Sequence, residues 1–363
     1  MIPRARHLVA AALSAALLVQ AALTGIANAA PTSRVYAVPL AKTVSDVQRV
    51  AEYWRPDRLQ RSDSYIPATP GAQAAPTSGA TVPGGPVPAG KRTGNPHLPT
   101  PAMPSTGTGT MANTMGKVFF TLGGKEYWCS ASSVAAPNRS VVATAGHCVY
   151  DPRQAKAAEN WVFVPNPLPN GQTPFGIYVG STISMHEDWT GKGDYDYDYA
   201  FVTVHRGFVW TPKNGSWVMK DVGRLQDNVG GLGLELNNRQ PTYQAVAFGY
   251  PAGAQPDSSR PFDGKTLRSC TGTVTRWTQA PNLDLQKGVQ LRRCDFSPGA
   301  SGGPWLTGFD QNRMLGNLTG VNSLTWDRDA KNWYDAVSSP YFDTATGDVY
   351  QRAATQTTPS KVT

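Results

Sequence analysis

Short apolar runs recur along the chain from residue 115 onward. Most of them lie close to Gly, Pro, Asn or Asp, which is typical of β-strands joined by turns. About 250 residues of such runs, with no internal repeat at a fixed period, fit a β-sandwich or one or two β-barrels. The runs are Lys117–Leu122, Val141–Thr144, Trp161–Val164, Tyr178–Val179, Ala200–Val204, Ala245–Tyr250, Thr273–Trp277 and Gly288–Leu291.

The start of the chain has a different pattern. Residues 1–29 begin with two arginines, continue as an apolar run that ends at Ile26, and close with the small-x-small sequence Ala27-Asn28-Ala29. This arrangement is typical of a secretory signal peptide. A membrane anchor is the alternative, but the run contains polar residues and no stop-transfer charges follow it. We therefore expect an extracellular protein that has no membrane contact once residues 1–29 are removed.

Residues 30–113 are expected to form a pro-segment and linker ahead of a domain at 114–363. Apolar residues at positions 44, 47, 50, 51 and 54 follow the three-and-four spacing of a short amphipathic helix. Residues 67–110 are instead rich in Pro, Gly, Ala and Thr, so they cannot bury enough apolar surface to offset chain entropy. Cleavage is expected near Lys91-Arg92 or later in this tract.

Charge and composition weaken the case for a nucleic-acid partner. The chain has a net charge of +8, but residues 30–113 carry eight basic and four acidic residues, and the signal peptide adds two arginines. Little basic excess is left for the domain, so we expect no nucleic-acid binding. Only 16 % of the residues are charged, and 36 Gly and 30 Pro suit short strands and many turns rather than a helical bundle.

Four cysteines lie in the β-rich region: Cys129, Cys148, Cys270 and Cys294. An even number in an exported chain predicts two disulfides, and nearness favours Cys129–Cys148 and Cys270–Cys294, one of three possible pairings. A structural zinc site is the competing use. The chain has no CxxC pair, and His147 is the one histidine next to a cysteine, so we expect no metal ion.

Three segments carry candidate chemistry. His147 stands at the end of a strand in Thr-Ala-Gly-His-Cys, where a general base would be held rigidly. Ser301 lies between glycines, which leave its hydroxyl uncrowded and allow backbone N–H groups to face an oxyanion. Asp198 precedes a buried strand and would hold an imidazole in one tautomer. Asp194 and Asp196 are rival carboxylates, because alternation along a strand would place all three on one face.

The order of these residues excludes one fold. Gly299-x-Ser301-x-Gly303 fits the nucleophile elbow of α/β-hydrolases, but that fold needs its triad histidine after the serine, and no histidine follows Ser301. The order His147, Asp198, Ser301 remains.

With these motifs the sequence resembles the chymotrypsin-like serine proteases, and more closely their bacterial secreted branch, which includes the glutamyl endopeptidases. The motifs are TAGHC around His147, Asp-x-Ala at Asp198, Gly-x-Ser-Gly-Gly-Pro around Ser301, and Gly-x-x-Ser ending at Ser323. The resemblance implies an all-β fold of two packed, antiparallel, six-stranded β-barrels with the active site between them. It also implies that Cys129–Cys148 is the disulfide beside the catalytic histidine.

The resemblance implies a role for each residue. His147 would be general base and then acid, Asp198 its orienting carboxylate, and Ser301 the nucleophile that forms an acyl-enzyme. The backbone N–H groups of Gly299 and Ser301 would form the oxyanion hole. Ala300 replaces the Asp that receives the freed amino terminus in animal digestive members, so a pro-segment here is expected to cover the site or assist folding.

Substrate preference is left open. Asp295 lies six residues before Ser301, where trypsin-type enzymes place the carboxylate that binds Lys or Arg. The neighbouring sequence differs, because Cys294 precedes this Asp instead of following it by two residues. Asn322 occupies the place of the acid-reading histidine of glutamyl endopeptidases, and with Ser323 it is expected to contact substrate.

We therefore expect a secreted, monomeric serine endopeptidase that acts on polypeptides without metal or cofactor. Two alternatives remain at this point. One is a non-catalytic binding or regulatory protein on a protease fold, with an occluded site, and the other is an esterase on the same fold.

Overall fold

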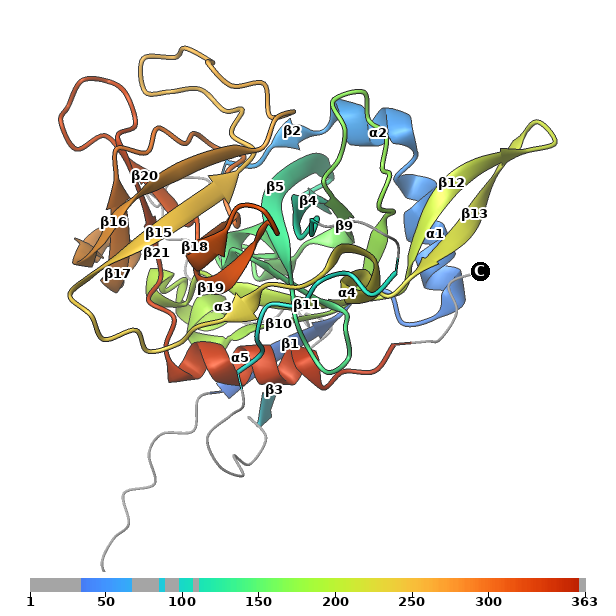
Figure 1. The fold of residues 1–363 in the computed structure, drawn as a ribbon, viewed down its shortest axis with the longest axis horizontal. Coiled ribbons are helices and arrows are strands. Elements are labelled where there is room, and N and C mark those ends of the chain that lie inside the picture. Colours follow the sequence, from blue (N-terminus) through green and yellow to red (C-terminus); the bar gives the residue numbers. More distant parts are fainter. Residues whose placement is uncertain (1–33, 67–84, 89–97, 107–110, 359–363) are drawn as a thin grey trace, which may run out of the picture. The chain divides into compact units, whose positions relative to one another are not determined.

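The computed structural model describes residues 34–66, 85–88, 98–106 and 111–358. The expected signal peptide, residues 1–29, lies outside this part of the chain. The expected all-β, two-barrel class is confirmed: one sheet closes into a six-stranded antiparallel barrel, and a second sheet has eight strands (Figure 1). Among the described residues no helix is long and apolar enough to cross a membrane.

The first barrel has the strand order β11-β6-β5-β4-β9-β10, and β10 pairs with β11 to close it. Four of the strands expected from the sequence are confirmed here, and β10 extends the expected run Tyr178–Val179 as far as His186. The strands are β4 (Met115–Leu122), β5 (Lys125–Val134), β6 (Val141–Thr144), β9 (Glu159–Pro165), β10 (Tyr178–His186) and β11 (Ala200–Val204).

Strand β5 was not predicted, because serines and alanines occupy most of its second half. Two of its buried serines have hydrogen-bond partners in distant parts of the chain, whereas the buried Ser132 hydroxyl has none among the described residues. Ser133 Oγ donates to the Gly230 carbonyl at 2.8 Å, and Ser130 Oγ donates to the Gly299 carbonyl at 2.8 Å. A buried hydroxyl with a partner costs little, so an apolar pattern is not required for this strand to be buried.

The second sheet has the order β14-β19-β18-β15-β16-β17-β21-β20, and every pair is antiparallel except β14–β19. Its core includes Val289, Leu291 and the fully buried Trp305. The strands are β14 (Gly233–Leu234), β15 (Thr242–Gly249), β16 (Arg268–Ala280), β17 (Leu285–Arg292), β18 (Pro304–Asp310), β19 (Leu315–Val321), β20 (Leu324–Trp326) and β21 (Ala336–Ser339).

Smaller elements surround the two sheets. Helix α5 (Thr344–Ala354) follows the last strand in the chain and packs on the first barrel, where Tyr350 Oη donates to the Ala135 carbonyl at 2.8 Å. The other elements are β7 (Tyr150–Asp151), β8 (Lys156–Ala157), β12 (Gly207–Lys213), β13 (Ser216–Gly223), α3 (Glu187–Lys192), α4 (Leu225–Val229), η1 (Gly146–Cys148), η2 (Tyr195–Tyr197) and η3 (Pro281–Leu283).

Part of the expected pro-segment belongs to the fold. The predicted amphipathic helix is confirmed as α1 (Val44–Tyr53), which begins with a capping box between Thr43 and Asp46. Its buried face packs on apolar residues of β9 and β10, and the following Trp54 is fully buried. The remaining elements of this segment are β1 (Arg34–Pro39), α2 (Pro56–Arg61), β2 (Asp63–Ser64) and β3 (Gly85–Pro88).

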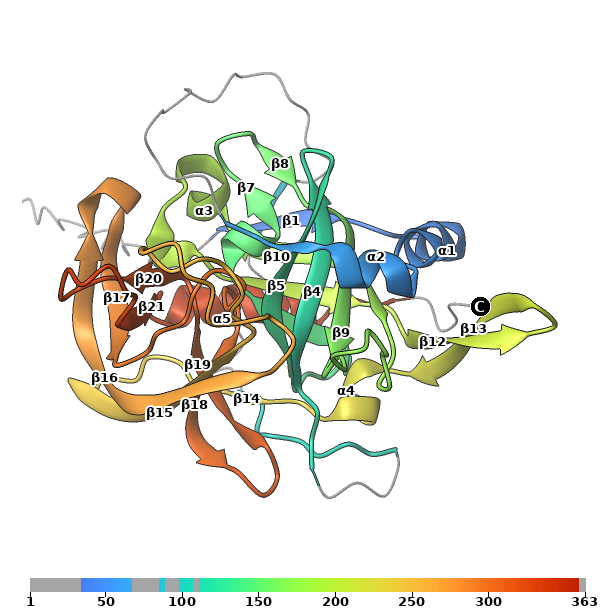
Figure 2. The same cartoon turned by 90° about the horizontal axis from the view of Figure 1, so that it is seen from above.

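Strand β1 extends the first sheet. It pairs antiparallel with β10 from Val35 opposite His186 to Pro39 opposite Thr182, and β3 pairs with its other edge. Val35 and Val38 are buried in the two clusters that fill the first barrel and the region beside it. Figure 2 shows β1 beside β10 on this side of the sheet. The segment is therefore packed into the sheet, whereas Lys91-Arg92 lies outside the described residues.

Lys117 of β4 is a buried amine in the first barrel. Its Nζ lies 3.9 Å from the ring centroid of Trp128 and 5.3 Å from that of Tyr250. Burial disfavours the charged form and lowers the pKa of Lys117 to about 7. The unfolded chain therefore holds this proton more tightly than the folded chain does. The charged Lys117 lowers the free energy of unfolding by its full amount below pH 7, and this penalty disappears as the pH rises toward 10.5.

Lys117→Met is expected to raise the melting temperature at pH 6 by at least about 2 °C, because it removes a desolvated charge and keeps the side-chain volume. The gain should shrink as the pH rises toward 10, which thermal unfolding at pH 6, 8 and 10 would measure. Lys125→Met, at an exposed position of the neighbouring strand, is the matched control. A gain for Lys117→Met that does not change with pH would contradict the assigned pKa.

Candidate active site

His147 and Asp198 form a buried pair at one end of the first barrel. Strand β6 ends at Thr144, and the short helix η1 then turns His147 toward Asp198, two residues before β11. His147 Nδ1 lies 2.8 Å from Asp198 Oδ2, and the backbone N–H of His147 donates to Asp198 Oδ1 at 2.8 Å. Because Asp198 is fully buried, this carboxylate fixes the orientation of the imidazole.

Asp194 and Asp196 do not share a strand face with Asp198, so that expectation is wrong. Residues 195–197 form the helical turn η2, because Asp194 Oδ1 accepts the N–H of Asp196 at 2.9 Å and caps the turn. Asp196 Oδ1 accepts the N–H of Lys287 at 2.7 Å. Burial, with neighbouring carboxylates, raises the pKa of Asp194 to about 6. Of these three carboxylates, Asp198 is the one paired with His147.

Ser301 lies on the turn between β17 and β18, between two glycines in left-handed conformations. Gly299 has φ +103° and Gly302 has φ +79°. A Cβ on Gly299 would lie 2.6 Å from the Trp128 ring, and one on Gly302 would lie 2.1 Å from Thr144 Oγ1. Both positions therefore require glycine, and the nucleophile turn is packed directly against the first barrel.

The backbone N–H groups around Ser301 are available. Within the described residues, no hydrogen bond is donated by the N–H of Gly299 or of Ser301, whereas the Ser301 carbonyl accepts from Ser130 N at 2.8 Å. Two unpaired N–H groups flanking a partly exposed serine can receive a developing negative charge. His147 Nε2 is buried and has no hydrogen-bond partner among the described residues, so Ser301 Oγ is not hydrogen-bonded to it in this structure.

Ser323 and Asn322 lie next to this site. Ser323 Oγ donates to Asp198 Oδ2 at 2.6 Å, so it supports the histidine pair from the second sheet. Asn322 is buried, and its amide donates to the Phe248 and Ala300 carbonyls at 2.8 Å each and accepts from the Trp305 indole at 2.7 Å. Both amide donors of Asn322 are used, so its side chain holds the nucleophile turn in place.

Asp295 is exposed, and its backbone carbonyl accepts from Gln255 Nε2 at 2.8 Å. An exposed carboxylate is screened by water, so it attracts a cation less than a buried one would. A role of Asp295 in binding a basic side chain stays a prediction.

Both disulfides join the partners that proximity along the chain favours. Cys129 of β5 is bonded to Cys148 of η1, with Cα atoms 6.2 Å apart, and Cys270 of β16 is bonded to Cys294, with Cα atoms 5.5 Å apart. The first bond ties β5 to the turn that carries His147. No free cysteine is found among the described residues.

Sequence reasoning missed Trp128 and Ser130, the residues of β5 that contact the nucleophile turn. The Trp128 ring packs on Gly299, and Ser130 bonds both the Gly299 and Ser301 carbonyls. Their position on either side of Cys129, in a predicted disulfide beside His147, is the signal that could have found them.

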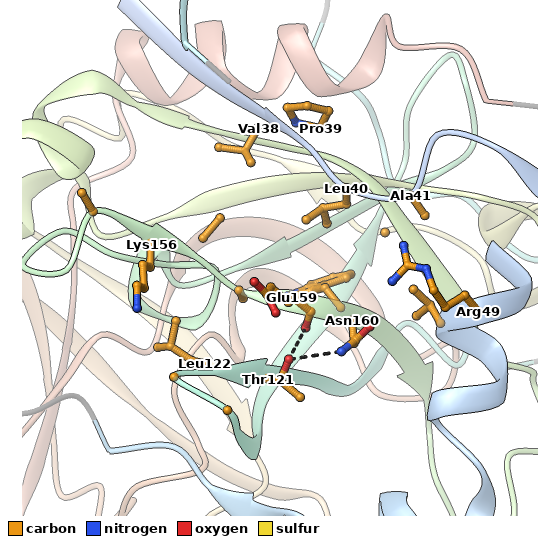
Figure 3. A pocket seen from close by; sticks show the side chains of 18 residues that line it. Val38, Pro39, Leu40, Ala41, Arg49, Thr121, Leu122, Lys156, Glu159 and Asn160 are labelled. Atoms are coloured by element: carbon orange, nitrogen blue, oxygen red, sulfur yellow. Dashed lines mark hydrogen bonds between the residues drawn. The ribbon is translucent and has the colours of Figure 1, made fainter. Parts of the chain in front are cut away.

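A cavity of about 710 Å³ lies elsewhere, between β1, α1 and the first barrel. Leu40, Arg49 and Glu159 are among its lining residues, and Thr121 Oγ1 accepts from Asn160 Nδ2 at 3.3 Å on its wall (Figure 3). None of the candidate site residues lines this cavity. It is a feature of the N-terminal segment and its contact with the barrel.

The comparisons with known proteins agree with this geometry. A family model described as trypsin matches residues 107–344. The chain belongs to the trypsin family of chymotrypsin-fold serine proteases, and the resemblance found in the sequence is confirmed. Polypeptide substrates follow from that membership. A search of curated protein sequences finds no match.

Solved structures of bacterial proteases share the fold. The protease Anisep from Arthrobacter nicotinovorans is 31 % identical, with a TM-score of 0.54, over 69 % of this chain and 99 % of that one. A thermostable serine protease from an extremophilic microorganism is 29 % identical, with a TM-score of 0.54, over 68 % of this chain and 99 % of that one.

Proposed function

We propose that this chain is a secreted serine endopeptidase in which His147, Asp198 and Ser301 form the catalytic triad. The observation that supports it most is the buried pair of His147 and Asp198, 2.8 Å apart, at the barrel end against which the Ser301 turn packs. Trypsin-family membership supports the same reaction class. Residues 1–29 are proposed to direct export, and the two disulfides suit an oxidising compartment.

In the proposed mechanism Ser301 Oγ attacks the carbonyl carbon of the scissile bond while its proton passes to His147 Nε2. The tetrahedral oxyanion accepts hydrogen bonds from the N–H groups of Gly299 and Ser301, each worth about 2.7–4 kcal/mol of barrier. His147 then gives its proton to the amide nitrogen, which leaves as an amine, and the acyl-enzyme remains. Water then attacks the acyl-enzyme while His147 acts as general base. His147 returns the proton to Ser301 Oγ, and the carboxylic acid product is released.

Asp198 keeps the Nδ1–H tautomer of His147 and stabilises the imidazolium after proton transfer. Ser323 donates to Asp198 Oδ2, the same oxygen that lies 2.8 Å from His147 Nδ1, and so limits rotation of the carboxylate. We assign Asn322 to the support of the nucleophile turn rather than to substrate recognition. The exposed Asp295 is a weak determinant for a basic side chain, so the preference at the cleavage site is not assigned to it.

Labelling with a fluorophosphonate tests the proposal. An activated serine reacts with this probe and an ordinary serine does not, so native protein should gain one label at Ser301, found by intact mass and peptide mapping. Denatured protein is the control and should gain none. Labelling that is equal in both states would contradict an activated nucleophile, and turnover of esters but not amides would indicate an esterase.

A further inference from the structure

The N-terminal segment reaches the candidate active site. Strand β2 pairs in parallel with β5, Asp63 opposite Tyr127 and Ser64 opposite Trp128. The next residue, Tyr65, donates its backbone N–H to the Trp128 carbonyl at 3.0 Å. Figure 2 shows α2 and the chain that follows it crossing β4 and β5.

This edge of β5 is next to the nucleophile turn. Two residues after Trp128, the N–H of Ser130 donates to the Ser301 carbonyl at 2.8 Å, and its hydroxyl donates to the Gly299 carbonyl at 2.8 Å. A peptide paired with Trp128 therefore lies on the strand that also supports the proposed oxyanion hole.

The ring of Tyr65 lies beside the imidazole of His147. The two rings are stacked, with ring centroids 6.1 Å apart and planes 29° apart. The Tyr65 ring packs edge to face against Tyr127 and Phe120, with ring centroids 5.0 Å and 5.5 Å apart. Tyr65 is only 6 % exposed and His147 only 3 %, and His147 Nε2 has no hydrogen-bond partner among the described residues.

A catalytic histidine that is buried in this way is hindered as a general base. The proposed mechanism requires Nε2 to take a proton from Ser301 and deliver it to a leaving amine, so the imidazole must be reachable and free to reorient. We propose that residues 63–66 form an inhibitory strap in which Tyr65 holds and covers His147. This inference rests on the proposed function and adds its regulation.

The residues just before the strap are held to β5 by polar contacts. Glu126 of β5 accepts hydrogen bonds from Tyr53 Oη at 3.0 Å and from Arg58 at 3.1 Å, and Arg61 lies 3.6 Å from its second oxygen. Glu126 is partly exposed, and such ion pairs contribute little each. Ile66, at the end of the strap, is 56 % exposed. The strap itself buries Ser64 and one apolar ring, that of Tyr65, so its detachment exposes less apolar surface than loss of β1 or α1 would.

The test compares labelling rates of Ser301 in the full chain. Tyr65→Ala removes the ring beside His147. It should speed labelling roughly tenfold, the factor that corresponds to one buried aromatic contact. Glu126→Ala loosens the strap without touching the triad and should speed labelling by a smaller factor. Tyr36→Ala and Glu52→Ala are the matched controls on the same segment. Tyr36 contacts Tyr150, and Glu52 pairs with Arg55.

The outcomes separate the strap from the proposed function. Faster labelling in Tyr65→Ala and Glu126→Ala, with unchanged controls, supports the strap, and Glu126→Ala decides the question if Tyr65→Ala does not fold. Slower or unchanged labelling in folded variants overturns it, because Tyr65 would then only support the histidine. If no chain is labelled at Ser301, including Tyr65→Ala, the proposed function fails as well.

Discussion

Ser301→Ala is expected to lower kcat for peptide hydrolysis by about 10⁶-fold, the loss usual when the nucleophile of a Ser-His-Asp triad is removed. No acyl-enzyme can form without Oγ, and only the oxyanion donors and substrate binding remain to lower the barrier. The measurement is turnover of an internally quenched peptide library, made in the full chain and in Tyr65→Ala so that the strap does not mask the difference.

Ser297→Ala is the matched control for Ser301→Ala. Ser297 lies on the same turn, is fully buried, and its hydroxyl has no hydrogen-bond partner among the described residues. Its removal should leave kcat within about threefold of the parent, because the change does not disturb a satisfied hydrogen bond. Equal turnover by Ser301→Ala and the parent would show that another residue is the nucleophile.

Asp198→Asn is expected to lower kcat by about 10⁴-fold near neutral pH. The amide keeps the shape of the side chain but can donate toward Nδ1 of His147, which favours the wrong tautomer. The backbone N–H of His147 and Ser323 Oγ both donate to this carboxylate, so a neutral group also weakens its hold on the imidazole. Steady-state kinetics, with circular dichroism to confirm folding, would measure the effect.

Asp194→Asn provides the comparison for Asp198→Asn. Asp194 lies on the same segment and caps η2, with no contact to His147, so its replacement should change kcat by less than about tenfold. A larger loss in Asp194→Asn than in Asp198→Asn would transfer the orienting role to Asp194.

The sequence predicted the barrel strands and α1 because both have a regular apolar period. It failed where side-chain hydrogen bonds, rather than an apolar period, decide the local structure. Asp194 caps the N–H of Asp196, so residues 195–197 turn instead of extending, and the three acids separate. Strand β5 was missed because it carries no apolar alternation: Ser130 and Ser133 are buried, and their hydroxyls donate to carbonyls in distant parts of the chain.

The contact between Tyr65 and His147 could not be predicted from local patterns. The two residues lie on different segments, and the register of β2 on β5 rests on only two paired positions. Tyr65 also follows a polar stretch without hydrophobic period. Long-range pairing of this kind depends on the completed barrel, which supplies Tyr127 and Phe120 as the surface that receives the ring.

The pairing of β1 with β10 has a consequence for maturation. A cut between residues 67 and 97 would end the covalent continuity of the backbone, yet residues 34–66 would stay in place as a light chain, because β1 and α1 are buried in the sheet and core. Denaturing gels would then report two polypeptides where native mass reports one particle, so loss of the N-terminal segment from a gel band is no measure of its loss from the enzyme.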